Sequence, residues 1–220
     1  MPSENIEYLT QLLKNNNTDI ITRRKHSYIM YQGVESGYIY VLLDGVVKLS
    51  NILRDGREFS TVYIVETDFV SLLEGSRNDE MSAVFNVRIE SDNAKFYKIR
   101  REKFWNLVQD DPRLFKIVDD FYKRRLIHSL DFLQKMTING KKGAVCTCIT
   151  SLIDYFGIQK KDGILIDFIV TNDDIAGFCG ISTRNSVNRI LRDLKNEKVI
   201  DIIDNKIMVY DSNYLKDYIR

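Results

Sequence analysis

The segment from Thr171 to Glu197 has the pattern of a short helix, a tight turn and a longer helix. Thr171 and Asn172 are residue types that cap helix N-termini, and the two aspartates after them suit the positive end of a helix dipole. Gly180 stands where the first helix must end, because glycine enters the left-handed region without penalty. The pattern therefore predicts a helical pair with a sharp turn between its members.

The second helix of this pair is predicted to be strongly two-sided. Either Ser182 or Thr183 can cap its N-terminus. Its apolar residues follow i, i+3, i+4, i+7 spacing and form a buried stripe of Val187, Ile190, Leu191 and Leu194. Its other face carries Arg184, Asn185, Ser186, Asn188, Arg189 and Arg192. This is a helix-turn-helix signature, in which the second helix reads base edges and grips phosphates.

Two β-type runs, Val199–Ile203 and Lys206–Tyr210, follow the helical pair directly. They are joined by Asp204-Asn205, residue types that tolerate the positive φ of a hairpin turn. Polar residues on a helix face are common on any solvated surface, and a glycine between two helices can mark a plain helical hairpin. The order helix, turn, helix, hairpin favours a winged helix that binds double-stranded DNA.

The N-terminal half has a different texture, with short β-type runs separated by glycines. Asp44-Gly45 and Asp55-Gly56 are strong hairpin turns. Short strands at near-regular spacing predict an antiparallel sandwich or roll, and the whole chain is assigned to the α+β class. The predicted strands are Ser27–Tyr31, Tyr38–Leu43, Val46–Asn51, Phe59–Val65, Ala83–Ile89 and Ala94–Ile99.

A long helix is predicted from Pro112 to about Met136, capped by Asp110 or Asp111. Its apolar positions are wider than one stripe, so it is expected to have partners on two sides. A candidate dimerisation seam at nearly coiled-coil spacing consists of Leu114, Val118, Phe121, Arg125, His128 and Phe132. A helix packed only within its own subunit is the alternative. Further elements expected are the helices Asn5–Lys14, Arg101–Leu107 and Lys141–Gly157, and the strand Ile164–Val170.

Composition limits the class of protein. With 220 residues, 44% hydrophobic and 29% charged, the chain can form one large or two modest globular domains. No apolar run approaches the ~20 residues of a membrane span, and the N-terminus has no signal-peptide pattern, so a cytoplasmic protein without membrane association is expected. The net charge of +1 neither supports nor excludes nucleic-acid binding, because such binding needs only a local basic surface.

Three cysteines, Cys146, Cys148 and Cys179, fit a reducing compartment better than a disulfide framework. Cys146 and Cys148 lie two apart on a helix and point to opposite sides, so they cannot share a metal ion. At best one of them is a lone thiol near the surface. No metal site is predicted.

The chain as a whole resembles the Crp/Fnr family of bacterial transcription regulators. The stretches most similar to the family are Tyr38–Lys48, the pair Asp68-Phe69, and Ser186–Leu194. Residues 137–146 (TINGKKGAVC) and the wing resemble the virulence-regulator branch typified by the listerial positive regulatory factor A. The resemblance implies a cyclic-nucleotide-binding-like, jelly-roll β-roll that senses an effector (1–109), a central dimerisation helix (110–137) and a winged-helix DNA-binding domain (138–220). It also implies a homodimer on a pseudo-palindromic promoter site and contact with RNA polymerase.

The family's recognition pattern transfers to the second helix with two departures. Arg189 matches the arginine of S/T-V-x-R, and Arg184 matches the arginine before the Ser or Thr. Asn185 replaces the Glu of cyclic-AMP-binding members, which changes the preferred base because Glu accepts from cytosine and Asn suits adenine. The path from Gly180 to Val187 is also one residue longer. The expected DNA contacts are Thr183, Arg184, Asn185, Ser186, Asn188 and Arg189, with Lys195 and Lys206 touching phosphate.

The effector positions depart further from the family. Where cyclic-AMP receptors have Gly-Glu and Arg-Ser, this chain has Ser71-Leu72 and Met81-Ser82, which are its candidate effector-pocket residues. Without the arginine, a buried cyclic phosphate would be uncompensated, so cyclic AMP is not expected as the ligand. The effector is left unassigned, and a cytosolic thiol, a peptide or no ligand all remain open.

Other sensor chemistries are limited by residue content. No cysteine precedes Cys146, which excludes the iron–sulfur sensor of the oxygen-responsive branch. Haem sensing stays open, although the only histidines, His26 and His128, fit ordinary surface or helix-seam positions better. No catalytic or phosphate-loop motif is present, so the chain is not expected to be an enzyme. The alternative function is a ligand-binding regulatory module that acts through protein contacts without DNA.

Overall fold

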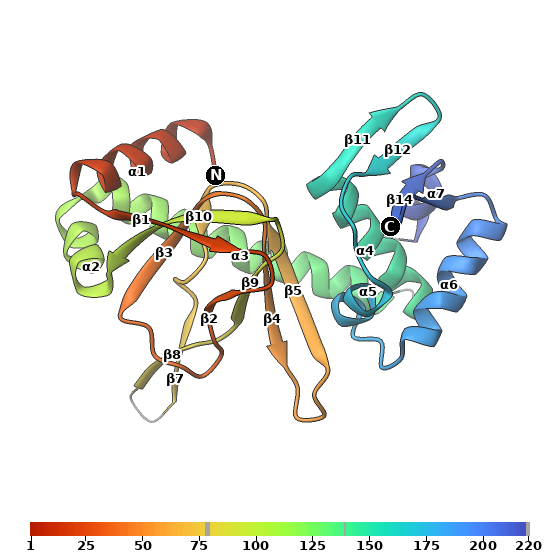
Figure 1. The fold of residues 1–220 in the computed structure, drawn as a ribbon, viewed down its shortest axis with the longest axis horizontal. Helices are drawn as coiled ribbons and strands as arrows, with labels where there is room; N and C mark the ends of the chain where they lie inside the picture. The colour runs from red at the N-terminus through yellow and green to blue at the C-terminus, as the bar shows by residue number, and fades with distance from the viewer. Residues whose placement is uncertain (78–79, 139, 219–220) are drawn as a thin grey trace. The chain divides into compact units, whose positions relative to one another are not determined.

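The computed structural model describes residues 1–77, 80–138 and 140–218, and side chains at 74–77, 80–81 and 137–138 are not described. The chain forms two compact units (Figure 1). The N-terminal unit comprises Met1–Gly56 with Ser60–Leu126, and the C-terminal unit comprises Arg57–Phe59 with Ile127–Arg220. No described helix is long and apolar enough to cross a membrane. The predicted three-part functional division at 109/110 and 137/138 remains a prediction.

The N-terminal unit is a β-roll with helices at both ends of its sequence. One sheet has the order β1-β10-β3-β6 and another the order β2-β9-β4-β5, while β7 and β8 form a separate pair. The elements are α1 (Ser3–Asn15), β1 (Asp19–Arg24), β2 (Tyr28–Met30), β3 (Tyr38–Asp44), β4 (Val47–Ile52), β5 (Glu58–Ile64), β6 (Asp68–Phe69), β7 (Glu74–Arg77), β8 (Glu80–Ala83), β9 (Asn86–Ile89), β10 (Asn93–Arg100), α2 (Arg101–Asp110) and α3 (Pro112–Ile138).

The predicted antiparallel roll is confirmed, and most predicted strands lie within two residues of their observed bounds. β10 pairs antiparallel with both β1 and β3. The turn after β3 requires glycine: Gly45 has φ +104°, and a Cβ there would lie 2.7 Å from the carbonyl oxygen of Asn93. The predicted strand Ala83–Ile89 was wrong in part, because it divides into the end of β8 and the separate strand β9. β1 was not predicted, since only one of its six residues is even half-buried and it shows no alternation.

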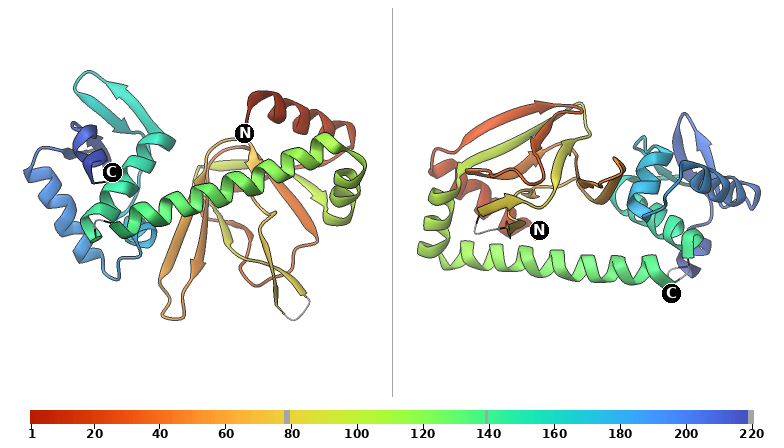
Figure 2. Two further views of the ribbon diagram at one scale, coloured as in Figure 1. Left: turned by 180° about the vertical axis from the view of Figure 1, so that it is seen from behind. Right: turned by 90° about the horizontal axis from the view of Figure 1, so that it is seen from below.

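The core of the β-roll is aromatic. The ring of Phe69 on β6 packs edge-on against Phe104 of α2 and Phe121 of α3, with centroids 5.6 and 5.5 Å apart. Leu9 of α1 and Tyr97 of β10 belong to the same buried cluster. The first part of α3 therefore belongs to the β-roll, and Figure 2 shows it running alongside the strands.

This packing corrects the predicted dimerisation seam. Leu114, Val118 and Phe121 are 0%, 5% and 2% exposed and lie in the core of their own subunit, so they cannot face a partner. Arg125 points to the β-roll and binds Asp68, while His128 is exposed and stacks on Phe132 within the same helix. The sequence showed that α3 is apolar on two sides but not which side faces inward.

A second set of contacts joins α3 to β6 and to the segment that follows β6. The carboxylate of Asp68 is 3.1 Å from Nη2 of Arg125 and 3.5 Å from Nη2 of Arg124. The hydroxyl of Tyr122 donates to the carbonyl oxygen of Leu72 at 2.9 Å. Asp68 is buried and also accepts from the backbone N–H of Phe69, so its charge is compensated.

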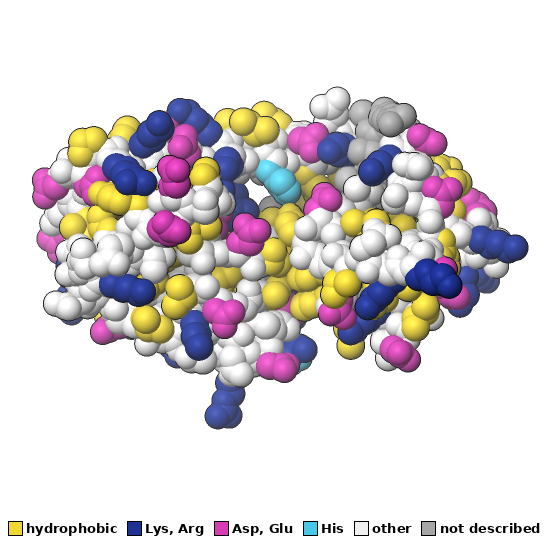
Figure 3. Space-filling model, turned by 90° about the horizontal axis from the view of Figure 1, so that it is seen from above, with side chains coloured by type: hydrophobic (Ala, Val, Ile, Leu, Met, Phe, Trp, Pro, Cys, Tyr) yellow, Lys and Arg dark blue, Asp and Glu magenta, His cyan; other side chains and the backbone are white. Residues whose placement is uncertain are grey.

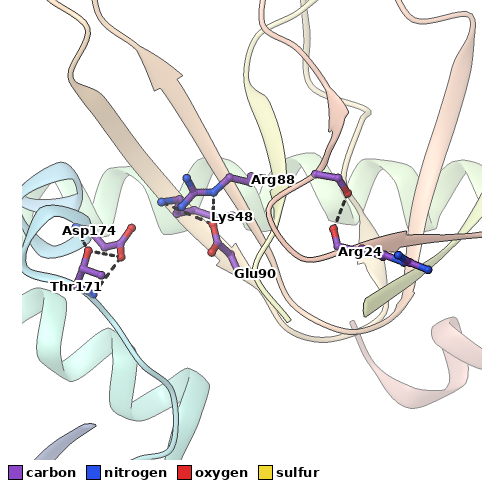
Figure 4. A network of polar contacts seen from close by, with 7 residues as sticks. Arg24, Lys48, Arg88, Glu90, Thr171 and Asp174 are labelled. Atoms are coloured by element: carbon purple, nitrogen blue, oxygen red, sulfur yellow. Dashed lines mark hydrogen bonds and ion pairs between the residues drawn. The ribbon is translucent and has the colours of Figure 1, made fainter. Parts of the chain in front are cut away.

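An ion-pair cluster lies on the other sheet of the β-roll (Figure 4). Oε1 of the buried Glu90 is 2.7 Å from Nε of Arg88 and 3.7 Å from Nζ of Lys48. Arg88 and Lys48 are cross-strand neighbours on β9 and β4. The carboxylate thus compensates two adjacent cations in the sheet.

The C-terminal unit packs three helices and a small sheet around α4. Its sheet has the order β11-β12-β14-β13. The predicted strand Ile164–Val170 was too long, because pairing ends at Ile166, while the unpredicted β11 completes a hairpin with β12. The elements are α4 (Gly140–Phe156), β11 (Gly157–Lys160), β12 (Gly163–Ile166), α5 (Asn172–Cys179), α6 (Arg184–Asn196), β13 (Ile200–Ile203), β14 (Lys206–Val209) and α7 (Ser212–Asp217).

The sequence allowed at most one cysteine of α4 to lie near the surface, and in the structure neither does. Cys146 and Cys148 are both buried, since α4 is the central helix of its unit and is covered on several sides. Burial raises the pKa of Cys146 to about 11. A hydrogen bond with Cys148 raises the pKa of Cys179 on α5. Thiols in this state are packing residues and weak nucleophiles.

The start of α3 generates a stability prediction. Oδ1 of Asp111 accepts from the backbone N–H groups of Arg113 and Leu114 at 2.9 and 3.1 Å, and Oδ2 accepts from the hydroxyl of Tyr8 on α1. Burial alone would raise the pKa of Asp111, but these hydrogen bonds outweigh it and hold the pKa below its ordinary value. Asp111 is therefore the N-cap of α3 and joins it to α1.

We expect Asp111→Ala to lower the free energy of unfolding by about 1–2 kcal/mol at pH 7. Because the folded pKa is depressed, this contribution is present above the ordinary carboxyl pKa and is lost as pH falls through the folded value. Urea unfolding, followed by the fluorescence of the single tryptophan, Trp105, should show the difference shrinking below about pH 4. The neighbouring exposed variant Asp110→Ala is the control, and an equal loss in both variants would contradict the capping role.

Candidate nucleic-acid interface

The first helix of the predicted helix-turn-helix is fixed at both ends. At its start, Oγ1 of Thr171 accepts from the N–H of Asp174 at 3.1 Å, and the Asp174 carboxylate accepts from the N–H of Thr171 at 3.1 Å (Figure 4). This reciprocal pair is a capping box. At its end, Gly180 has φ +60° and ψ +24°, the left-handed conformation that the sequence predicted for it.

The second helix, α6, is held by its apolar stripe. Val187, Ile190, Leu191 and Leu194 are all buried, as predicted. Thr183, not Ser182, is the N-cap, and its Oγ1 lies 3.4 Å from the N–H of Ser186 and 2.9 Å from the hydroxyl of Ser186. The turn between the C-cap Gly180 and the N-cap Thr183 therefore consists of Ile181 and Ser182.

The polar face of α6 is turned to the exterior. Arg184, Asn185, Asn188 and Arg189 are exposed, and Ser186 is half-buried because its hydroxyl lies against Thr183. These side chains occupy consecutive turns of one helix that is anchored from the opposite side. Such a helix face can enter a major groove.

The wing is confirmed as a hairpin of β13 and β14 with Asp204 and Asn205 at φ 49° and 62°. A hollow of about 430 Å³ separates α6 from the wing. Its lining includes Arg184, Asn188, Arg192 and Lys195 from α6, and Ile202 and Asn205 from the wing. Three predicted contact residues, Arg184, Asn188 and Lys195, therefore line this hollow together with the wing. The other five are not among its lining residues: Thr183, Asn185, Ser186, Arg189 and Lys206.

Several predicted DNA contacts are already paired within the protein. Nη1 of Arg184 is 3.8 Å from Asp173, Nζ of Lys195 is 2.5 Å from Asp201, and Nζ of Lys206 is 2.6 Å from Asp167. The hydrogen bond from Lys206 lowers the pKa of Asp167, and that from Lys195 lowers the pKa of Asp201. The amide of Asn172 donates to Oδ1 of Asn188.

Sequence reasoning missed these partners. Asp173 was assigned only to the helix dipole, and Asn172 only to capping. Asp167 and Asp201 were not linked to the interface. The pair Asp167–Lys206 joins residues 39 apart, which become neighbours only when β12 and β14 pair. The spacing of residues along the sequence therefore gives no indication of this contact.

A polar cluster supports α6 from its C-terminal end. Nζ of Lys142 on α4 is 3.0 Å from Glu197 and 2.8 Å from the hydroxyl of Tyr214 on α7. Burial alone would lower the pKa of Lys142, but its hydrogen bonds with Tyr214 and Glu197 raise it. The hydroxyl of Tyr214 also donates to Glu197, so three helices meet at one charge-compensated point.

The candidate effector residues lie in the N-terminal unit, on the segment after β6 and on β8. Oγ of Ser71 accepts from the N–H of Tyr40 at 2.6 Å, and the side chain of Leu72 is part of the buried core. Both side chains contribute to the packing of the N-terminal unit, and their assignment to an effector pocket remains a prediction. Ser82 is half-buried on β8, and the side chain of Met81 lies outside the described residues.

Comparison with known proteins agrees with this geometry. Residues 145–218 match the Crp-like helix-turn-helix domain, and residues 21–111 match the cyclic nucleotide-binding domain. The lactate racemization regulatory protein of Lactiplantibacillus plantarum is 46% identical over 214 residues, which is 97% of each chain. This chain belongs to the Crp/Fnr family of transcription regulators.

Other Crp/Fnr regulators are more distant. The listeriolysin regulatory protein of Listeria monocytogenes is 29% identical over 88% of this chain and 82% of its own. Among solved structures, the c-di-GMP responsive global regulator CLP of Xanthomonas campestris has a TM-score of 0.78 at 15% identity, covering 93% and 99% of the two chains. That likeness shows the fold. The family consists of DNA-binding transcription regulators and not of enzymes, as the sequence predicted.

The caps of α6 give a matched pair of variants in adjacent residues. We expect Thr183→Ala to cost about 1 kcal/mol of stability, because the first turn of α6 loses its side-chain acceptor. Ser182→Ala should cost close to nothing, since Ser182 is exposed and does not cap the helix. Urea unfolding monitored by far-ultraviolet circular dichroism measures both. A larger loss for Ser182→Ala would contradict the assignment of the N-cap.

Proposed function

We propose that this Crp/Fnr regulator acts as a homodimer that places α6 of each subunit in the major groove of a pseudo-palindromic promoter site. The observation that carries the proposal is the exposed polar face of α6 on a helix anchored by four buried residues. Two-fold symmetry then predicts half-sites about one helical turn, roughly 34 Å, apart.

The proposed contacts divide by chemistry. Arg184, Asn185, Asn188 and Arg189 reach base edges or adjacent phosphates, with Ser186 and Thr183 at the start of the helix. Arginine pairs with guanine, and asparagine with adenine. Lys195, which lines the hollow, and Lys206 on the wing strand β14 contact phosphate and set register without reading sequence.

We assign the dimer interface to a different face of α3 from the one buried in the β-roll. This face, called here the exposed stripe, consists of Phe115, Tyr122, Leu126, Leu130 and Leu133. Its residues other than Tyr122 are each about 60% exposed. At 3.6 residues per turn these side chains fall within one sector of the helix. Packing against a second copy would remove this continuous apolar stripe from water. Leu126, Leu130 and Leu133 are separated by four and three residues, which is the spacing of paired helices.

For the division of labour we propose residues 1–109 as the sensing domain, 110–137 as the dimerisation helix and 138–220 as the DNA-binding domain. An effector would act by shifting the population of dimers whose winged helices fit DNA. The absence of an arginine beside Ser82 argues against a cyclic phosphate. Contact with RNA polymerase and action in the cytoplasm follow from a role in transcription and complete the proposal.

The relatives' names bear on the target genes. Kinship with the virulence-regulator branch rests on residues 137–146, the wing and 29% identity to the listeriolysin regulatory protein. Identity to the lactate racemization regulatory protein is 46% over nearly the whole chain. We therefore favour targets related to lactate racemization over virulence genes.

Selection of bound fragments from genomic DNA by the purified full chain tests the function. The expected result is a two-fold-symmetric motif, with affinity that falls as salt rises because phosphate contacts release counterions. Selection is repeated with cell extract, which supplies a diffusible effector if one is needed. If neither selection yields a motif, the protein-contact alternative replaces DNA binding.

Arg189→Ala tests the assigned reading of bases. Loss of a bidentate arginine contact should weaken binding to the selected site about 10- to 100-fold, with scrambled DNA affected much less. Lys216→Ala, which removes an exposed cation from α7, is the control and should change both affinities little. Fluorescence anisotropy measures the four constants, and unchanged site affinity in Arg189→Ala would remove this residue from the interface.

Leu126→Glu tests whether the exposed stripe of α3 forms the dimer interface. A carboxylate in the middle of an apolar interface is desolvated without a partner, so the dimer should dissociate at micromolar concentration. Lys116→Glu places the same side chain about 100° around the helix from Phe115 and should leave the dimer intact. Sedimentation velocity distinguishes the dimer from the 25.7 kDa single chain. A dimeric Leu126→Glu protein would move the interface elsewhere.

A further inference from the structure

Three cations of the proposed DNA-contacting set are matched with three aspartates. Arg184 pairs with Asp173, Lys195 with Asp201, and Lys206 with Asp167. The aspartates come from three different places: the first turn of α5, strand β13, and the residue just after β12. The same arrangement thus recurs on both helices and on the wing sheet.

The cations of two pairs, Arg184 and Lys195, line the hollow between α6 and the wing. Lys206 does not line the hollow itself, but it lies on the wing hairpin between two lining residues in sequence, Asn205 and Ile207. All six side chains keep at least 32% of their surface exposed. Figure 3 likewise shows Lys and Arg side chains beside Asp and Glu side chains over the C-terminal unit.

A carboxylate next to a cation occupies the place that a DNA phosphate would take. Exposed ion pairs contribute only about 0.2–1 kcal/mol, so a phosphate can displace the aspartate. The displaced carboxylate stays attached beside the DNA backbone and repels it within a Debye length. Each phosphate contact is therefore made at the expense of an existing contact and next to a remaining negative charge.

We propose that Asp167, Asp173 and Asp201 are built-in competitors of DNA phosphate that attenuate the electrostatic affinity of the winged helix. The inference rests on the proposed phosphate contacts of Arg184, Lys195 and Lys206. Arg189 and Asn185 carry no such aspartate among the described residues, so base recognition is left available while phosphate attraction is reduced. The net charge of +1 for the whole chain fits a DNA-binding protein whose cations are internally balanced.

Neutralising one competitor tests the proposal. Asp201→Asn and Asp167→Asn should each tighten binding to a scrambled fragment about two- to fivefold at low salt, with a smaller gain at high salt. Asp204→Asn is the matched control, because it removes the same charge from the same wing at a turn that asparagine tolerates, and Asp204 has no cationic partner among the described residues. Its gain should be clearly smaller. Fluorescence anisotropy with the full chain gives each dissociation constant.

A second variant separates release of the cation from a general change of charge. In the Lys195→Gln background, Asp201→Asn should give no more gain than Asp204→Asn, because no cation is left to be released. Equal gains for Asp201→Asn and Asp204→Asn in the natural background, or a full gain without Lys195, would overturn the proposal. If the unaltered protein binds neither the selected nor the scrambled fragment at low salt, both without and with cell extract, the proposed function itself fails.

Discussion

The packing of Phe69 between Phe104 and Phe121 is the contact on which the other features of the N-terminal unit depend. It commits one face of α3 to the β-roll core and thereby fixes which residues remain outside. The sector that remains carries Phe115, Leu126 and Leu133, too apolar for a solvated surface. One buried aromatic cluster thus decides both the fold of the N-terminal unit and which face of α3 stays exposed.

Polar contacts join β6 and the segment after it to α3. Asp68 of β6 binds Arg125, and the carbonyl oxygen of Leu72 accepts from the hydroxyl of Tyr122. The candidate effector residue Ser71 lies in the same segment, where its hydroxyl accepts from the backbone N–H of Tyr40 on β3. A signal that changes the segment would reach α3 directly through an ion pair and a hydrogen bond, without a chain of intermediates.

In the proposed complex with DNA, affinity and recognition are carried by different groups. The proposed recognition surface is a helix face whose position is set by apolar residues, caps and the Lys142–Glu197–Tyr214 cluster. The proposed attraction to phosphate comes from cations that are already paired with aspartates. Binding of this kind exchanges one set of polar contacts for another, so the surface can be matched to DNA without a large positive net charge.

The sequence alone determined what local chemistry controls: the two helices of the helix-turn-helix, the left-handed Gly180, the hairpin turn at Asp204-Asn205 and the antiparallel class of the roll. It could not choose between the two apolar faces of α3, because periodicity shows amphipathicity but not which side meets the core. It also gave no sign that Asp167 pairs with Lys206 or that the hydroxyl of Ser71 accepts a hydrogen bond from the backbone of Tyr40. These residues are distant in sequence and meet only when the strands and segments pack together. Tertiary packing decided those questions, because burial and charge pairing depend on neighbours in space.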